Sequence, residues 1–364
     1  MSKSLSSVKI EIQNPDLLDQ TFVEEVDTDL LRRCISYLIE ENIFQRNGND
    51  INQGINPAVY FAYLKNVHDG KVQITYKKGN GDRFGLYRKY ATVPECNACG
   101  ACHFMREIRA ALYKDKYIDL DIVNAYPNFM YAITKGQYLG EYINNRDPYL
   151  KEVMDTCHVS RDKAKQLFLM MGFGGNYTTW YKENANTVTP SDFVVKYYNE
   201  MQASRKTIID YFKKFTYTID CVIGRGKFEK SRTGKQRNSH MDGIVKADSY
   251  EKGKGDYDID NGAISRCMQF LEVNIIRAVY KKLKDIGIDV KTCVYCFDGC
   301  MVSKAEMERV GYTADKLVEA INQYIHGLEY YIPLDNINFI SKEFELNGFD
   351  PMKYEPTKFN SYEE

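Results

Sequence analysis

Two apolar segments, far apart in the sequence, carry aspartates where a buried strand would place aliphatic side chains. The first reads Tyr117-Ile-Asp-Leu-Asp-Ile-Val-Asn-Ala-Tyr-Pro127, and the second reads Val294-Tyr-Cys-Phe-Asp-Gly-Cys-Met-Val302. A carboxylate in an apolar strand is costly unless a positive group meets it. A divalent metal would do so, because Mg²⁺ prefers one or two carboxylates together with substrate phosphates. The pattern therefore predicts that Asp121 and Asp298 share a metal site.

Each segment also fits a purely structural interpretation. Asp119 and Asp121 alternate on one face of the first strand, and aspartates near a strand end can cap the following helix, here N-terminal to Tyr126. The Asp298-Gly299 pair is a common turn dipeptide, so the second segment also fits a plain hairpin. Neither segment decides the question alone.

A third segment, Arg161 to Gly174, predicts a helix with cations and an aromatic on one face. Arg161, Lys165, Leu169 and Phe173 are spaced by four and therefore share that face. Two stacked cations followed by an aromatic can grip a triphosphate and present a flat surface to a base. An amphipathic helix with solvent-facing cations has the same spacing, but it does not explain Phe173 on the cationic face.

These three segments together match the requirements of two-metal nucleotidyl transfer. Two Mg²⁺ ions about 4 Å apart would bind both carboxylates. Lys165 and Arg161 would offset the charge that develops on the triphosphate.

The remaining elements predict an α+β domain whose antiparallel sheet is interrupted by a helical insertion. The sequence predicts helices over 27–45, 104–112, 264–284 and 305–324, and a largely helical region over 148–215. It predicts strands over 117–123, 290–302, with a break at Asp298-Gly299, and 337–344. It also predicts hairpins over 72–90 and 216–229, which turn at 79–81 and 224–226, and an exposed loop over 231–258.

Composition places this chain inside a cell. No stretch approaches 18 apolar residues, the N-terminus has no apolar targeting region, and the ten cysteines lack the spacing of a disulfide framework. We therefore expect an intracellular protein, in the cytoplasm or at a host-nuclear or viral replication site, with no membrane partner. The net charge of −1 identifies no partner, although residues 205–237 hold ten Lys or Arg, and such a stretch can track a phosphate backbone or form a solvated surface.

At these residues the chain resembles the family-A DNA polymerases and the related single-subunit RNA polymerases of phage and mitochondria. The family pattern Arg-x3-Lys-x7-aromatic-Gly is met by Arg161, Lys165, Phe173 and Gly174, and its first acidic motif is met by Asp121. Its hydrophobic-His-Asp motif is met by Phe297-Asp298, with Phe in place of His. Three further segments resemble the family in the same order along residues 83–303, namely Met105 to Leu112, the Gly-Arg hairpin Cys221 to Phe228, and the helix Gln269 to Arg277. The Asp-x-x-Asn-Ala-x-Pro form is most similar to the transposon and virophage branch.

The resemblance implies a right-hand polymerase. Its antiparallel palm would comprise 76–135 and 216–364, its inserted helical fingers 136–215, and its reduced thumb 1–75. Two Mg²⁺ ions, with Mn²⁺ as a substitute, would be held by Asp121 and Asp298, with Asp119 as a reserve carboxylate. The other implied roles are catalysis by Lys165, nucleotide binding by Arg161, Lys165, Leu169, Phe173, Gly174 and Tyr126, and primer or template binding by Arg106, Arg109, Arg225 and Gln269.

Two departures from the family bear on the sugar. Tyr126 could block a ribose 2′-hydroxyl, as a Tyr does in the family-B motif Asp-x-x-Ser-Leu-Tyr-Pro-Ser, which favours deoxynucleotides. Phe173 replaces the usual Tyr, whose hydroxyl helps sugar selection, which relaxes discrimination. We expect primer extension with dNTPs on DNA, without proofreading, alongside a helicase or other replication proteins.

Other functions remain open at this point. An RNA polymerase or primase follows if Phe173 outweighs Tyr126. A non-catalytic nucleic-acid-binding replication subunit would not need the set of Asp121, Asp298, Arg161 and Lys165. A metal-dependent nuclease would need more acids than the two motifs provide.

Two further groups of residues have alternative interpretations. The spacing of Cys96, Cys99, Cys102 and His103 suits zinc, but no second pair follows at the usual distance, and the metal is left out of the prediction. Tyr177, Trp180 and Tyr181 could stack on a template base or simply pack within the helical region.

Overall fold

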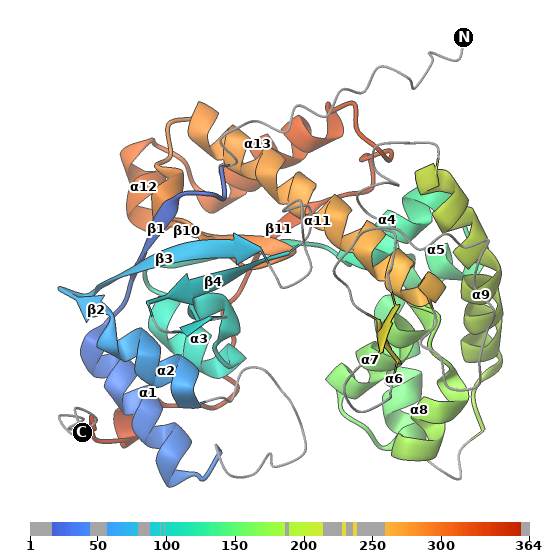
Figure 1. Ribbon diagram of the computed structural model, residues 1–364, viewed down its shortest axis with the longest axis horizontal. Coiled ribbons are helices and arrows are strands. Elements are labelled where there is room, and N and C mark those ends of the chain that lie inside the picture. The colour runs from blue at the N-terminus through green and yellow to red at the C-terminus, as the bar shows by residue number, and fades with distance from the viewer. Residues whose placement is uncertain are drawn as a thin grey trace.

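Two larger antiparallel sheets, one two-stranded sheet and twelve α-helices form the described part of the protein in the computed structural model. The described residues are 17–43, 57–78, 88–94, 96–97, 99–185, 189–213, 228–230, 236–238 and 259–357. Figure 1 shows α1 to α3 and α4 to α9 on opposite sides of the molecule. The helices are α1 (Thr28–Glu40), α2 (Pro57–Lys65), α3 (Arg106–Tyr113), α4 (Ala125–Thr134), α5 (Gln137–Asn144), α6 (Arg146–Cys157), α7 (Arg161–Gly172), α8 (Tyr177–Asn184), α9 (Asp192–Lys213), α11 (Ile259–Asp285), α12 (Lys304–Arg309) and α13 (Ala314–His326).

The sheet that carries the aspartates has the strand order β11-β6-β10-β9, and its neighbours are all antiparallel. Its strands are β6 (Tyr117–Ile122), β9 (Val294–Tyr295), β10 (Gly299–Ser303) and β11 (Phe339–Lys342). Along β6, the aliphatic and tyrosine side chains are buried, whereas Asp119 and Asp121 are half-buried. The alternation follows from the two-residue period of a strand, and it confirms the predicted strand.

The second sheet has five strands and lies nearer the N-terminus. They are β1 (Thr21–Glu25), β2 (Val67–His68), β3 (Lys71–Lys78), β4 (Lys89–Val93) and β5 (Cys96–Asn97). The pairing of β3 with β4 confirms the hairpin expected over 72–90, although its turn at 79–81 lies outside the described residues. The expected boundary between thumb and palm, at residue 75, falls within β3.

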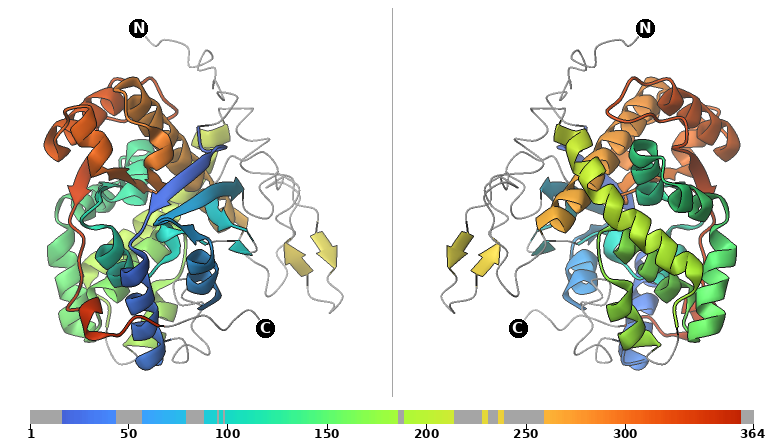
Figure 2. Two further views of the ribbon diagram at one scale, coloured as in Figure 1. Left: turned by 90° about the vertical axis from the view of Figure 1, so that its left-hand side faces the viewer. Right: turned by 90° about the vertical axis from the view of Figure 1, so that its right-hand side faces the viewer.

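Helices α4 to α9 follow β6 and precede the rest of its sheet, which confirms the predicted helical insertion. The long helix α9 packs against α4, α5 and α7, and also against α11 (Figure 2, right). Tyr197 and Phe212 of α9 are buried, so this helix is the central packing element of the helical insertion. The expected long helix over 264–284 is also confirmed, as α11.

Several sequence-based expectations are wrong in detail. The strand expected over 290–302, with its break at Asp298-Gly299, is found as β9 and β10, which pair as a hairpin with Asp298 in the turn, but Val290–Thr292 at its start form a short 3₁₀ helix instead. The single helix expected over 305–324 is two helices, because Gly311 adopts a φ of 75° after α12 ends. The region expected as a loop over 231–258 contains a short strand, β8 (Gln236–Asn238). This strand pairs with β7 (Phe228–Lys230), which lies just before the region. The hairpin turn at 224–226, with Arg225, lies outside the described residues.

Candidate active site

Asp121 and Asp298 come together because β10 lies unusually close to β6. Gly299 is the register partner of Asp121, and the Ile122 amide donates to the Asp298 carbonyl over 3.1 Å. A Cβ on Gly299 would lie 2.3 Å from the Leu120 carbonyl oxygen and 3.2 Å from Asp121 Oδ1. Only glycine permits this approach, so the Asp-Gly pair both forms the hairpin and sets the carboxylate of Asp298 beside that of Asp121.

The surroundings of Asp298 disfavour its negative charge. Burial, then the charges of Asp121 and Glu272, raise the pKa of Asp298 to about 7, against the opposing effect of Arg88. Within the described part of the chain, no salt bridge joins Asp298 to a cation. A half-buried carboxylate beside other acids is stabilised by an added positive charge.

The neighbouring acids of β6 have only partial compensation. Lys342 Nζ lies 3.0 Å from Asp121 Oδ2, with the lysine side chain 43% exposed. Burial raises the pKa of Asp119, while the nearby Arg109 lowers it. The site therefore gathers acids from β6, from the β9–β10 turn and from α11, with Arg88, Arg109 and Lys342 nearby.

This arrangement fits a divalent metal. Two neighbouring carboxylates at the end of a sheet, one of them with a raised pKa, offer the hard oxygen ligands that Mg²⁺ takes together with substrate phosphates. No group of three or more His, Cys, Asp or Glu side chains is arranged around one point in the described residues. The remaining ligands would therefore come from the substrate and water. The alternative role for the β6 aspartates is not found, since the N-cap of α4 is Asn124.

The predicted helix 161–174 forms as α7, with its cations on the exposed face. Ser160 caps its N-terminus and Phe173 its C-terminus, and Gly174 follows with a φ of 84°. Leu169 is 43% exposed on the same face, while the opposite face packs into the core through Ala164, Leu167, Phe168 and Met171.

The two predicted site cations of α7, Arg161 and Lys165, have exposed acidic partners. Arg161 pairs with Asp147, and Lys165 Nζ lies 3.3 Å from Asp162 Oδ1. Burial lowers the pKa of Lys165, and the charges of Arg161 and Arg146 lower it further, against the opposing effect of Asp162. Neighbouring cations that repel one another make a site for an anion.

Two contacts join this helical region to Asn124 and Tyr126, which follow Asp121 along the chain. The ring of Phe173 meets the ring of Tyr126 edge to face, with centroids 5.3 Å apart. Arg146, at the start of α6, donates to the Asn124 side chain, and among the described residues its buried Nε has no hydrogen-bond partner. Tyr126 lies in the first turn of α4, soon after Asp121, so α7 ends at the same site as β6.

A buried ion pair lies against Tyr126. Arg88 Nε and Nη2 donate to the two carboxylate oxygens of Glu272 over 2.6 and 2.7 Å. Arg88 also donates to the Tyr126 hydroxyl. The Arg88 guanidinium lies 4.7 Å from the ring centroid of Phe297, the residue before Asp298. Glu272 is fully buried on α11.

The predicted primer or template residues are spread over several elements. Arg106 pairs with Glu345 over 2.8 Å, and Arg109 lies near Asp119 and Asp121. Gln269 is half-buried on α11, where it donates to Ser265. The structure places Arg109 nearer the carboxylates than Arg106, and Arg225 lies outside the described residues.

Sequence reasoning missed Arg88, Glu272, Arg146 and Lys342 as members of this site. The sequence does contain one indication that Glu272 is a site residue, because it is a lone acid in the apolar run Phe270 to Val273 of a helix. Arg88 had none, because its partner is 184 residues away. Contacts of that span depend on the fold rather than on local pattern.

The cysteine and aromatic groups take structural positions. Cys99 Sγ donates to the Val59 carbonyl over 3.0 Å, and Cys102 Sγ lies 3.1 Å from His103 Nδ1. Trp180 and Tyr181 are buried, which favours packing over stacking on a base.

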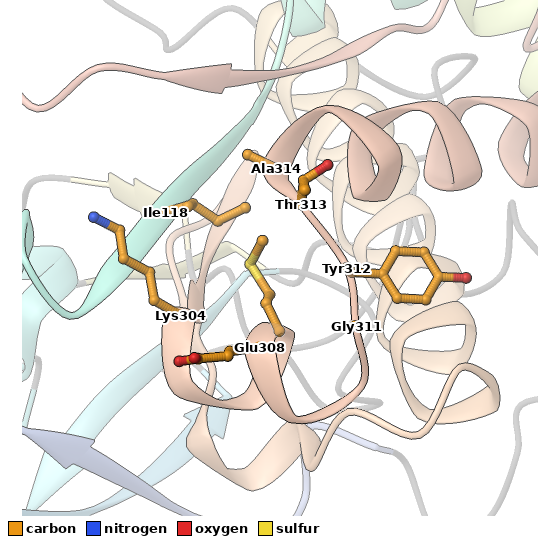
Figure 3. Close-up of a pocket in the computed structure, with 8 residues that line it drawn as sticks. Ile118, Lys304, Glu308, Gly311, Tyr312, Thr313 and Ala314 are labelled. Atoms are coloured by element: carbon orange, nitrogen blue, oxygen red, sulfur yellow. The ribbon is translucent and has the colours of Figure 1, made fainter.

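A separate pocket of about 470 Å³ lies near the start of β6, between α12 and α13 (Figure 3). Ile118, Lys304 and Tyr312 are among its lining residues, and none of the predicted site residues is. No helix among the described residues is long and apolar enough to span a membrane.

Comparison with known proteins gives a distant relative and a distant structural likeness. The relative is a Sputnik virophage protein described as "Putative helicase V13", 24% identical over 316 residues that cover 84% of this chain and 33% of that protein. This chain therefore spans about a third of the relative's length. The structure is the polymerase domain of Pol1 from M. smegmatis in complex with DNA primer–template and dNTP, with a TM-score of 0.46 and 12% identity over 78% of this chain and 50% of that one. No family model matches the sequence.

Proposed function

We propose that this protein extends a DNA primer by template-directed nucleotidyl transfer. The observation that carries the proposal is the juxtaposition of Asp121 and Asp298, enforced by the close approach at Gly299, with the cationic face of α7 ending at the same site. Carboxylates that collect metal beside cations that collect phosphate are the two requirements of this reaction.

Asp121 and Asp298 would hold two Mg²⁺ ions, for which Mn²⁺ can substitute. When bound, the metal supplies activation of the primer 3′-hydroxyl and charge compensation for the leaving pyrophosphate. The raised pKa of Asp298 makes its ionisation depend on a neighbouring positive charge. Lys342, which pairs with Asp121 in the structure, would compete with the metal for that carboxylate.

Arg161 and Lys165 would bind the triphosphate. The primer oxygen bonds to the α-phosphorus as the bond to pyrophosphate breaks, so negative charge builds on the leaving group next to α7. The lowered pKa of Lys165 makes its proton easier to give to that leaving group. Arg161 would remain charged throughout and hold the phosphates in place.

Tyr126, Leu169, Phe173 and Gly174 would form the pocket for the base and sugar. The edge-to-face contact of Tyr126 with Phe173 supports one continuous aromatic wall there. Within this proposal, Tyr126 excludes the ribose 2′-hydroxyl. A ribonucleotide-using polymerase or primase is the second candidate, favoured by Phe173 at a position where the family usually has Tyr.

Primer and template would contact the palm, formed by 76–135 and 216–364, through Arg106, Arg109, Arg225 and Gln269. Residues 136–215 would form the fingers and 1–75 a reduced thumb. The described virophage relative is named as a helicase, which supports a helicase as the partner activity.

A primer-extension assay tests the proposal. Wild type and Asp298→Ala are incubated with Mg²⁺ and a labelled primer–template, with dNTPs or rNTPs supplied separately. Extension that follows the template, by wild type alone, is the expected result. No extension with either pool, despite tight binding to the primer–template, would favour a binding subunit instead.

A further inference from the structure

We infer that the buried Arg88–Glu272 ion pair is a positioning device for Tyr126 and sets the discrimination between deoxyribose and ribose. This inference rests on the proposed function, since it concerns the sugar pocket of the same site. Neither residue belongs to the metal or triphosphate groups described above. Its basis is a closed set of contacts around one phenol.

The Tyr126 hydroxyl contacts this pair. It accepts a hydrogen bond from the Arg88 guanidinium, and burial together with the nearby negative charge of Glu272 raises the pKa of the phenol. The two charged groups also hold each other through two short bonds, of 2.6 and 2.7 Å. A planar guanidinium bound to a carboxylate at both ends has little freedom to rotate, so the phenol is fixed at its tip.

The rest of the Tyr126 ring is fixed by packing. The Tyr126 ring packs edge to face with the ring of Phe173. The Arg88 guanidinium lies 5.6 Å from the centroid of the Tyr126 ring. A tyrosine held at both tip and edge cannot turn aside for an added hydroxyl. Rigidity of this kind is what a steric wall against a 2′-hydroxyl requires, because a mobile ring would yield.

The pair also reaches the metal-binding turn. Arg88 lies over the ring of Phe297, whose φ of 63° directs the chain into Asp298. Glu272 is fully buried and forms the ion pair with Arg88, while Asp298 acts on Arg88 only through its nearby charge. Loss of Glu272 would therefore free Arg88 to move toward Asp298 and release Tyr126.

The test measures kcat/KM for a matched dNTP and rNTP at one template position. The variants are Glu272→Gln, which keeps the shape but removes the charge, and Tyr126→Phe, which keeps the ring and the ion pair. Asp19→Asn is the matched control, because it removes the acidic partner of Lys89, the neighbour of Arg88, without touching Tyr126.

We expect Glu272→Gln and Tyr126→Phe to lower the dNTP-to-rNTP ratio by about tenfold, mainly through faster rNTP use, while Asp19→Asn leaves the ratio unchanged. A ratio unchanged in both variants, with wild type active, overturns the inference and leaves the proposed function intact. Should Glu272→Gln fail to fold, Tyr126→Phe decides alone. Absence of incorporation by wild type overturns the proposed function and this inference with it.

Discussion

Gly299 on β10 lies directly opposite Asp121 on β6, at a point where a side-chain carbon would come within 2.3 Å of the Leu120 carbonyl oxygen. The two strands can approach this closely only because Gly299 has no side chain. The position of Asp298, the preceding residue, depends on the same approach. The absence of a side chain at Gly299 therefore helps to set the separation of the Asp121 and Asp298 carboxylates.

Gly299→Ala should damage both stability and activity. The added methyl group meets backbone rather than a flexible side chain, so we expect a loss of about 1–3 kcal/mol in the free energy of unfolding. Displacing a ligand by about 1 Å should lower single-nucleotide incorporation about 100-fold. Urea unfolding and single-turnover incorporation measure the two effects. Gly327→Ala is the control, since its new methyl group would lie 3.4 Å from its nearest neighbour; equal behaviour of the two variants would contradict the account.

Asp298→Asn should stabilise the metal-free protein in a pH-dependent manner. Because the folded-state pKa of Asp298 is raised to about 7, the stability linked to its proton is present below the ordinary carboxyl pKa of about 4 and is lost as the pH rises to 7. The variant removes that loss. Its Tm in EDTA should exceed that of wild type by about 2 °C or more at pH 8 and by less at pH 5.

The same two proteins should also differ in how their Tm responds to Mg²⁺. Mg²⁺ should raise the Tm of wild type at pH 8, because ligands that bind the folded state stabilise it. Asp298→Asn should respond much less. An offset between the proteins that is constant from pH 5 to pH 8, or an equal response to Mg²⁺, would be inconsistent with the proposed metal site.

Lys342→Met should make the protein bind Mg²⁺ more tightly. Lys342 competes for Asp121, but the pair is partly exposed, so its removal should gain at most about fivefold in affinity. Titration of Mg²⁺ followed by the change in Tm gives the affinity. Lys353→Met, at an exposed lysine away from the sheet, controls for the change in net charge. Weaker Mg²⁺ binding by Lys342→Met would show that the lysine supports the site instead.

Arg161→Ala and Lys165→Ala should each lower kcat/KM for the incoming nucleotide by about 10- to 100-fold, the effect of losing a hydrogen bond to a charged group. Primer–template affinity should change little. Lys163→Ala is the control because Lys163 is exposed on the same helix but two residues from Arg161, and thus on another face. Similar losses in all three variants would indicate a general charge effect rather than a triphosphate site.

The local pattern of the sequence was sufficient for the elements that carry the site. Strand β6 and helix α7 formed where alternation and four-residue spacing predicted them. The sequence allowed the Asp298-Gly299 pair to be either a metal-binding segment or a plain hairpin turn. In the structure the pair forms a hairpin turn, and this turn places Asp298 near Asp121.

What the sequence could not predict depends on long-range contacts. The Arg88–Glu272 pair joins residues 184 positions apart, and the Lys342–Asp121 pair joins residues 221 apart. Likewise, the break between α12 and α13 depends on one residue, Gly311, adopting positive φ within an otherwise helical pattern. Spacing along the chain carries no information on which distant strand will lie beside β6.

The most direct test of the central claim is single-turnover incorporation of one nucleotide by wild type, Asp121→Asn and Asp298→Asn, each at several Mg²⁺ concentrations. If both carboxylates hold the catalytic metal, each variant should lose at least about 1,000-fold in rate while still binding primer–template. The double variant should lose little more than either single one, because the two residues act as a unit. Template-directed incorporation by either variant at the wild-type rate would contradict the account.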